Sequence, residues 1–175
     1  MLFIDNPVLG PGLRQNDMFL IETGLLLLRN KHYKEAERHL EIYAERKGTD
    51  FDLLMQLGVC AQEQGHFRKA INLFQQANML RPRQPNALYR LQYCQARTEQ
   101  YRAQCDTLLE LEKLLPEDPK ITTETGLCLI QLEAWDEALK RFYKLEVTGK
   151  NLVPSMRAIA WCHLRLHQFP EAEKY

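Results

Sequence analysis

Apolar residues recur along the chain in pairs of helical stripes. In residues 51–84, small and large apolar side chains fall at i, i+3, i+4 and i+7, which is one face of a helix. The residues of this first stripe are Leu54, Leu57, Gly58 and Ala61. Gly65 predicts a turn after it, and a second stripe follows until Pro82, because proline cannot continue a helix. The pattern predicts two antiparallel helices joined by a short turn.

This pattern returns every 34 residues. An unbroken series of aromatic residues marks one phase of the period: Tyr33, Phe67, Tyr101, Trp135 and Phe169. The repeats divide the chain into units 17–50, 51–84, 85–118, 119–152 and a partial unit 153–175. Residues 1–16 precede them and, with two prolines and two glycines, read as an extended segment. A helix pair cannot bury its apolar face alone, so successive units are expected to stack.

The order of residues within one unit resembles the tetratricopeptide repeat, and the resemblance covers residues 17–175. The residues that carry it are Leu57, Gly58, Ala61, Gly65, Phe67, Ala70, Phe74, Ala77 and Pro82. The resemblance implies an all-α fold, a right-handed α-solenoid of stacked antiparallel helix pairs. It also implies that the facing positions of a pair hold small residues. The third unit departs from this with Gln92 and Gln104, and we expect its helices to be splayed or bridged by the two amides.

Four of the five cysteines also follow the 34-residue period: Cys60, Cys94, Cys128 and Cys162. Metal cages usually contain closely spaced ligand pairs, which this series lacks. A disulfide needs Cα atoms about 4.4–6.8 Å apart, whereas equivalent neighbouring helices lie roughly 10 Å apart. We therefore interpret the series as buried packing positions, where cysteine acts as a small apolar residue. Cys105 lies outside the series and receives no role.

Composition limits the classes of partner and compartment. With 23 basic and 23 acidic side chains, the chain has no net field that would attract nucleic acid or an anionic membrane. Its most apolar stretch, residues 19–30, is interrupted by Glu22 and is too short for a membrane span. No secretion signal is evident, and the cysteines favour a cytoplasmic location. The fifth unit stops at Tyr175, partway through its second helix, which predicts a longer protein.

The sequence gives no catalytic or cofactor signature, and we expect neither an enzyme nor a bound cofactor or metal. His163 and His167 have metal-ligand spacing, but the repeat places His167 in a turn, so both read as satisfied structural histidines. The turn at Gly10–Gly12 lacks the lysine of a phosphate loop. The carboxylates are interpreted as solvated helix faces.

The resemblance assigns a binding surface to the first helix of each unit, which in this family lines a concave groove. The groove residues that it implies are Met18, Ile21, Leu25, Arg29, Met55, Val59, Tyr89, Arg90, Tyr93, Arg97, Leu127, Gln131, Arg157, Trp161 and Arg165. Lys120, Ile130 and Leu164 fall on the same stripe. Exposed apolar residues mixed with tyrosine, tryptophan and arginine are typical of interaction sites.

The predicted partner is a protein or peptide, an extended or helical apolar segment with acidic flanks. Residues 1–16 are an alternative occupant, since their apolar extended chain lies next to the first unit. The carboxylate clamp of chaperone-binding repeats is absent, because its lysine and asparagine positions hold apolar or aromatic residues. These include Ile21 and Leu25, Met55 and Val59, and Tyr89 and Tyr93.

Three functional classes remain open. The leading hypothesis is a non-enzymatic adaptor that binds its partner in the groove. The second is a secretion-type chaperone that shields an apolar partner segment. The third is a regulatory or scaffolding arm of a larger protein with a separate catalytic domain.

Overall fold

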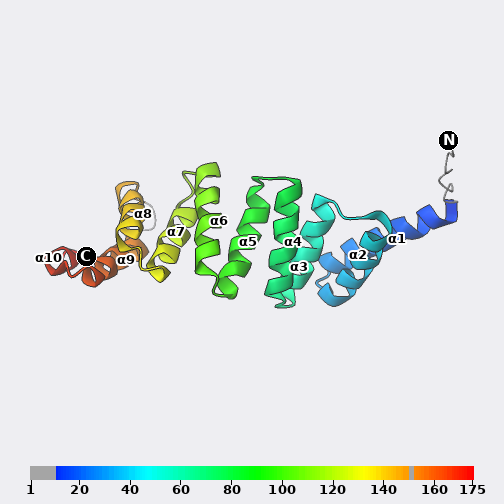
Figure 1. Cartoon of the computed structure of the whole chain (residues 1–175), viewed down its shortest axis with the longest axis horizontal. Helices are drawn as coiled ribbons and strands as arrows, with labels where there is room; N and C mark the ends of the chain where they lie inside the picture. Colours follow the sequence, from blue (N-terminus) through cyan, green and yellow to red (C-terminus); the bar gives the residue numbers. More distant parts are fainter. Residues whose placement is uncertain (1–10, 150–151) are drawn as a thin grey trace, which may run out of the picture. The chain divides into compact units, whose positions relative to one another are not determined.

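The computed structural model describes residues 11–149 and 152–175, and within these ranges the chain forms helices and no strand (Figure 1). The helices are α1 (Pro11–Arg29), α2 (Tyr33–Lys47), α3 (Phe51–Glu63), α4 (Phe67–Leu80), α5 (Pro85–Arg97), α6 (Tyr101–Leu114), α7 (Pro119–Gln131), α8 (Trp135–Val147), α9 (Leu152–Arg165) and α10 (Phe169–Ala172). The all-α fold of consecutive helix pairs predicted from the repeat is confirmed.

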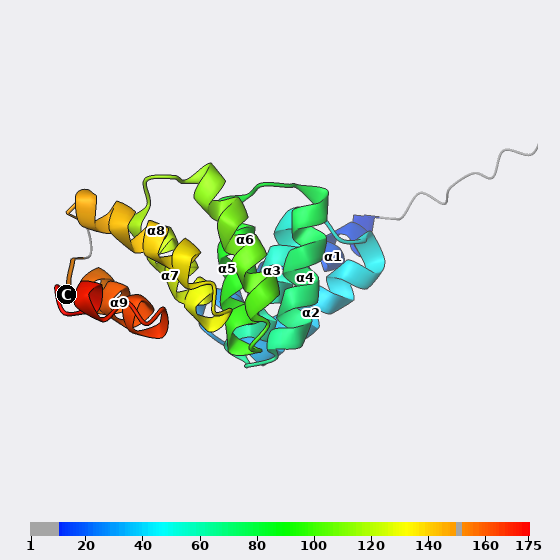
Figure 2. The same cartoon turned by 60° about the vertical axis from the view of Figure 1, so that its left-hand side comes forward.

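The helices form two compact units, which are divided between Leu80 and Arg81. In the first unit α1 packs on α2, α2 on α3, and α3 on α4. In the second, α5 packs on α6, α6 on α7, α7 on α8, α8 on α9, and α9 on α10. Figures 1 and 2 both show α3 beside α4 and α5 beside α6 along most of their lengths.

Three of the first helices begin where the repeat predicted. Helices α3, α5 and α7 start at Phe51, Pro85 and Pro119, which are the first residues of three predicted repeats. Proline suits the first turn because its fixed φ is helical and the missing N–H would have no helical partner. Before α3, the Asp50 carboxylate accepts a hydrogen bond from the Leu53 amide at 2.8 Å and caps the helix.

The start of the first helix differs from the prediction. Helix α1 begins at Pro11, so residues 11–16, which we expected to be extended, are helical. Pro11 and Gly12 were interpreted as signs of extended chain, but Pro11 occupies the helix's first position, where proline is tolerated. Residues 1–10 of the predicted extended segment lie outside the described residues.

One left-handed residue ends the first helix of every repeat. Positive φ angles of 57–78° recur at Lys31, Gly65, Glu99, Glu133 and His167. The next residue's amide donates to a carbonyl five residues back, from His66 to Ala61 at 2.8 Å and from Ala134 to Leu129 at 2.9 Å. This is the closing bond of a Schellman turn. All five repeats therefore have this turn, although the left-handed residue is glycine in only one of them.

Helix pairs approach closely where a glycine of the first helix faces a large side chain of the second. A Cβ atom on Gly58 would lie 2.4 Å from the Phe74 ring, and one on Gly126 would lie 2.6 Å from the Phe142 ring. Both rings are completely buried. An added methyl group at either position would force the facing ring to move, because protein interiors are closely packed.

Polar side chains join neighbouring helices of the first unit. The Gln64 amide on the C-terminal side of α3 donates to Glu37 of α2 at 2.5 Å, and Lys69 of α4 pairs with the same carboxylate at 2.7 Å. Asp17 of α1 is paired with Lys47 and Arg46 of α2 at 2.9 and 3.2 Å. Hydrogen bonds from Lys47 and Arg46 hold the pKa of the Asp17 carboxyl below its ordinary value.

The exceptional third repeat contains the predicted amide bridge. The Gln104 side-chain N–H of α6 donates to Gln92 Oε1 of α5 at 3.2 Å, and the Gln92 amide donates to Glu124 Oε2 of α7 at 2.9 Å. The Cys128 thiol lies 3.4 Å from Gln104 Oε1. Gln92 is buried, so this chain of hydrogen bonds satisfies an amide that would otherwise be costly in the core.

We predict that Gly58→Ala destabilises the chain by up to about 2 kcal/mol. Overpacking against the immobile Phe74 ring costs about 1–3 kcal/mol, whereas alanine gains about 1 kcal/mol in helix propensity. Urea unfolding followed by circular dichroism measures the difference. As a control, Phe74→Leu should cost less in the Gly58→Ala background than in the original chain. Equal or greater stability of Gly58→Ala would contradict the packing argument.

We also predict that Gln92→Ala and Gln104→Ala are energetically coupled. The double-mutant cycle should give an interaction of about 0.5–3 kcal/mol, because each change removes the other amide's partner. Gln95→Ala is the matched control for Gln92→Ala, since Gln95 is a buried amide of the same helix that accepts from Thr107 Oγ1 instead, at 2.9 Å. Gln95→Ala and Gln104→Ala should add within about 0.5 kcal/mol. Additivity in both cycles would show that the bridge contributes nothing.

Candidate functional site

An apolar groove of about 730 Å³ lies between α7 and α9 of the second unit. Three of its side chains are large, apolar and about half exposed: Leu127 at 50%, Trp161 at 51% and Leu164 at 45%. The full lining is Leu127, Ile130, Val153, Pro154, Arg157, Ala158, Ala160, Trp161, Leu164 and Tyr175. The volume is within the range of protein binding sites.

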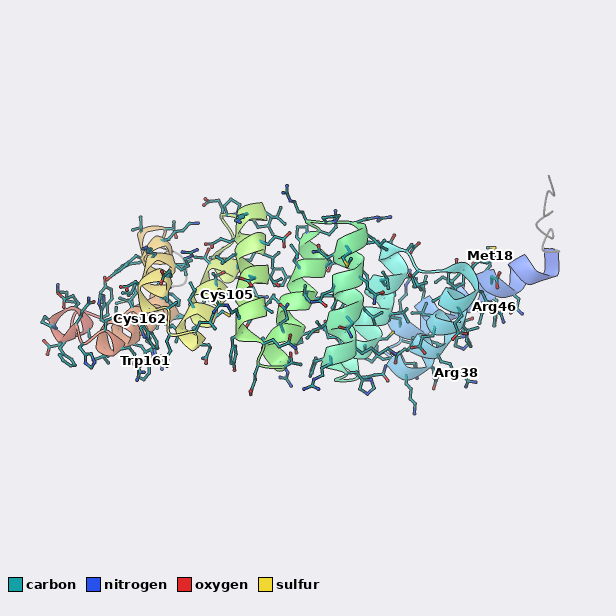
Figure 3. All side chains as sticks on the ribbon, in the orientation of Figure 1. Met18, Arg38, Arg46, Cys105, Trp161 and Cys162 are labelled. Carbon is teal, nitrogen blue, oxygen red and sulfur yellow. The ribbon has the colours of Figure 1, made fainter. Side chains whose placement is uncertain are left out.

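Helical periodicity separates the groove face of α9 from its core face. Arg157, Trp161 and Leu164 follow i, i+4 and i+7 and line the groove, whereas the intervening Ile159 and Cys162 are buried. Figure 3 labels Trp161 and its buried neighbour Cys162 on this helix. The same helix therefore supplies both the core of the second unit and its exposed apolar surface.

The charge in the groove is positive. Arg157 lines it, is exposed and makes no ion pair with any residue that the structure describes. Arg165 lies one turn beyond Trp161, where its guanidinium stands 5.2 Å from the Trp135 ring centroid, a cation–π contact. The structure thus brings together Leu127, Arg157 and Trp161 of the predicted set. Gln131 and Arg165 belong to the same helices but do not line the groove.

The predicted residues of α5 lie beside α7 in the same unit. Tyr89 is half buried, and the Lys120 ammonium stands 5.0 Å from its ring centroid. Burial, with the charges of Glu124 and Asp118, raises the pKa of Tyr89 to about 12, so the phenol is neutral. Tyr93 and Arg97 are exposed on later turns of the helix, and Arg90 is half buried.

The predicted residues of the first unit have mixed exposure. Met18 and Arg29 of α1 are exposed, whereas Ile21, Leu25 and Val59 are half buried. Met55 differs from the prediction because its side chain is 5% exposed and offers no free surface. Helix α3 packs on both α2 and α4, which leaves it less open than α1.

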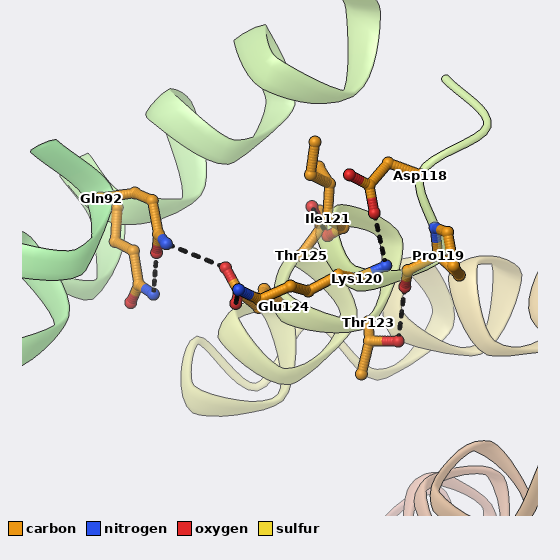
Figure 4. Close-up of polar contacts among 9 residues, drawn as sticks. Gln92, Asp118, Pro119, Lys120, Ile121, Thr123, Glu124 and Thr125 are labelled. Carbon is orange, nitrogen blue, oxygen red and sulfur yellow. Dashed lines mark hydrogen bonds and ion pairs between the residues drawn. The ribbon is translucent and has the colours of Figure 1, made fainter. Parts of the chain in front are cut away.

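The sequence analysis missed five groove residues and one carboxylate. The groove residues outside the predicted stripe are Val153, Pro154, Ala158, Ala160 and Tyr175. Glu124 was interpreted as part of a solvated face, but burial raises the pKa of its carboxyl above the ordinary 4.5, and Gln92 hydrogen-bonds it (Figure 4). Its spacing of four residues from Lys120 was the available signal, because such pairs share a helix face.

The cysteines occupy packing positions, as predicted. All five are buried and free. Burial raises the pKa of Cys60 and Cys128 to about 12 and that of Cys162 to about 11, so each is a neutral thiol and a poor nucleophile. Within residues 11–149 and 152–175 no cluster of three or more histidine, cysteine, aspartate or glutamate residues has metal-binding geometry.

His163 and His167 occupy structural positions. His163 is buried rather than at the surface, and its ring nitrogens lie 2.7 Å from the Tyr143 hydroxyl and 2.7 Å from Gln168 Oε1. With Nδ1–H donating to the amide oxygen, Nε2 accepts from Tyr143 and both nitrogens are satisfied. His167 occupies the turn, as the repeat predicted. Among the helices that the structure describes, none has the length and apolar character needed to cross a membrane.

Comparisons with known proteins agree with the repeat architecture. A family model described as "Psidin, N-terminal TPR repeats region" matches residues 15–124. The phagocyte signaling-impaired protein of Drosophila pseudoobscura pseudoobscura is 35% identical over 95 residues, which is 54% of this chain and 10% of that protein.

Solved structures of low identity share the fold. A tetratricopeptide repeat protein from Parabacteroides merdae has a TM-score of 0.77 at 21% identity, covering 91% of this chain and 64% of that one. MamA from Desulfovibrio magneticus RS-1 has a TM-score of 0.75 at 19% identity, covering 91% and 90%. This fold is typical of protein–protein interaction modules. Since the family model matches more than half of the residues, the chain belongs to the tetratricopeptide repeat family, in the group of the psidin N-terminal repeat region.

Proposed function

We propose that the chain is a non-enzymatic interaction module whose α7–α9 groove binds an apolar protein segment that carries an acidic residue. The observation that carries the proposal is the convergence of three half-exposed apolar side chains, Leu127, Trp161 and Leu164, on one groove with Arg157. The five free cysteines favour a reducing compartment such as the cytoplasm for this interaction.

The apolar side chains supply affinity. A tryptophan buries about 150–250 Å² when it is fully covered, and half of the Trp161 surface is still exposed. Covering that half removes about 100 Å² of largely apolar surface from water, which is worth roughly 2–3 kcal/mol at about 25 cal/mol per Å². Tryptophan in such a position is the commonest kind of binding hot spot.

Arg157 selects the charge of the partner. Among the described residues that line the groove it is the only charged one, and the Tyr175 hydroxyl there donates to Glu146 at 3.3 Å. A guanidinium recognises a carboxylate through two parallel hydrogen bonds. One cation at the side of an apolar surface favours a segment that presents apolar residues and one acidic side chain. A small polar ligand would need several converging polar groups.

We predict that Trp161→Ala weakens peptide binding about tenfold or more. Short random peptides displayed on phage are selected on the immobilised chain, and the enriched sequences are synthesised and titrated. The enriched peptides should combine large apolar residues with aspartate or glutamate. Arg157→Gln should weaken binding of these peptides and remove the preference for the acidic residue.

Phe169→Ala is the matched control for Trp161→Ala. Phe169 is 55% exposed and aromatic but does not line the groove, so this change should leave affinity within about twofold. Circular dichroism verifies that each variant is folded. Equal binding by Trp161→Ala would overturn the proposal. A dimer of the chain that dissociates on Trp161→Ala would also overturn it, by showing that the groove's occupant is a second copy.

A further inference from the structure

The side-chain ammonium of Lys120 lies beside the groove, between an aromatic ring and a carboxylate. The Lys120 ammonium lies 5.0 Å from the Tyr89 ring centroid and 4.0 Å from Glu124 Oε1. Figure 4 shows Lys120 and Glu124 adjacent on α7, with Gln92 of α5 reaching the carboxylate from the other side. An aromatic face with a neighbouring carboxylate is the arrangement by which proteins recognise ammonium and guanidinium groups.

The carboxylate of this arrangement is held in place from the core. Gln92 donates to Glu124 Oε2 at 2.9 Å and is itself fixed by the hydrogen bond from Gln104. Glu124 Oε1 faces Lys120 and retains acceptor capacity, since an ionised carboxylate offers about four acceptor sites. Its orientation is therefore set before any partner arrives.

In the chain without a partner, the positive charge close to the Glu124 carboxylate does not offset the effect of its burial. Burial raises the pKa of its carboxyl, Asp118 adds to this effect, and the opposing effects of Lys120 and Gln92 do not reverse it. The Lys120 side chain is 68% exposed, and its 4.0 Å pair with Glu124 is at the outer limit of an ion pair. Exposed pairs of this spacing on a helix contribute little, so Lys120 can be displaced.

We propose that Tyr89 and Glu124 form a second subsite, which takes a lysine or arginine side chain of the partner in exchange for Lys120. The inference rests on the proposed function of the α7–α9 groove. Arginine fits best, because its planar guanidinium stacks on a tyrosine ring while donating two hydrogen bonds to a carboxylate.

The two subsites adjoin each other along α7. Glu124 and Leu127 are three residues apart, a rise of about 4.5 Å along the helix, so the cation subsite borders the apolar groove. Arg157 lies on α9, on the other side of that groove. A partner that bridges both therefore carries its basic residue toward α5 and its acidic residue toward α9, with apolar residues between them. This charge order fixes the direction in which the segment binds.

The test repeats the peptide selection on the Glu124→Gln variant. Peptides selected on the original chain should carry lysine or arginine at a constant spacing from the apolar residues, on the side opposite the acidic residue. On Glu124→Gln the basic residue should lose its enrichment, while the apolar and acidic residues keep theirs. Glu137→Gln is the matched control, because it removes an equal charge from an exposed position of α8.

Titration of synthetic peptides makes the test quantitative. A selected peptide with arginine should bind the original chain about fivefold more tightly than the same peptide with glutamine, and both should bind Glu124→Gln equally. Lys120→Met should strengthen binding of the arginine peptide about two- to threefold, because the internal competitor is gone. A purely structural Lys120–Glu124 pair would give no such gain.

The outcomes separate the two proposals. The second subsite would be overturned if the selected apolar and acidic peptides lacked a basic residue. It would also be overturned if the basic residue stayed enriched in peptides selected on Glu124→Gln. Either result would leave the proposal of the groove intact. Selection of no apolar and acidic peptides would overturn the groove and, with it, the second subsite. If Glu124→Gln does not fold, unchanged affinity of the arginine peptide for Lys120→Met overturns the cation exchange.

Discussion

The contact between a small residue on one helix and a large side chain on its partner determines the geometry of each helix pair. Gly24 faces Leu40, Gly58 faces Phe74 and Gly126 faces Phe142, each with no space for a Cβ atom. Because the helices approach this closely, the large side chains are completely buried and the first helix leaves another face for other contacts. The third repeat shows what happens without glycine. Gln92 needs a polar partner in the core, and its bonds to Gln104 and Glu124 orient the carboxylate of the proposed cation subsite.

Much of the fold was predictable because the repeat period is long and its positions are constrained by packing. The starts of α3, α5 and α7 and the burial of the cysteine series depend on that period alone. The start of α1 could not be obtained this way, since no earlier repeat fixes its phase. The period also predicted where the turns fall, but in four of the five repeats no glycine indicated their left-handed backbone. Lys31, Glu99, Glu133 and His167 adopt a left-handed conformation that usually favours glycine, and the packed helices on either side impose it.

The helices that supply the candidate site could be predicted, but the burial and contacts of individual side chains could not. The resemblance to the repeat family implied that Leu127, Arg157 and Trp161 line a groove, and the structure brings these three residues to one groove. The burial of Met55 and the environment of Glu124 depend instead on neighbouring helices. One neighbour of Glu124 is Gln92, which is 32 residues earlier in the chain. A sequence pattern within one helix cannot reveal such a contact, because the pKa of a carboxyl responds to burial by the surrounding elements.

Charge distribution has a consequence for how the proposed surface would discriminate between partners. The 23 basic and 23 acidic side chains cancel, so no long-range field draws an oppositely charged partner to the chain. Arg157 and Glu124 act only over short distances, because exposed charges are screened beyond about 10 Å at ordinary ionic strength. Selection among partners therefore depends on how long a docked segment stays bound, which is the usual origin of affinity differences between related complexes. A segment with its charges reversed would meet Arg157 with a cation and Glu124 with an anion, and such like-charge contacts shorten the bound lifetime.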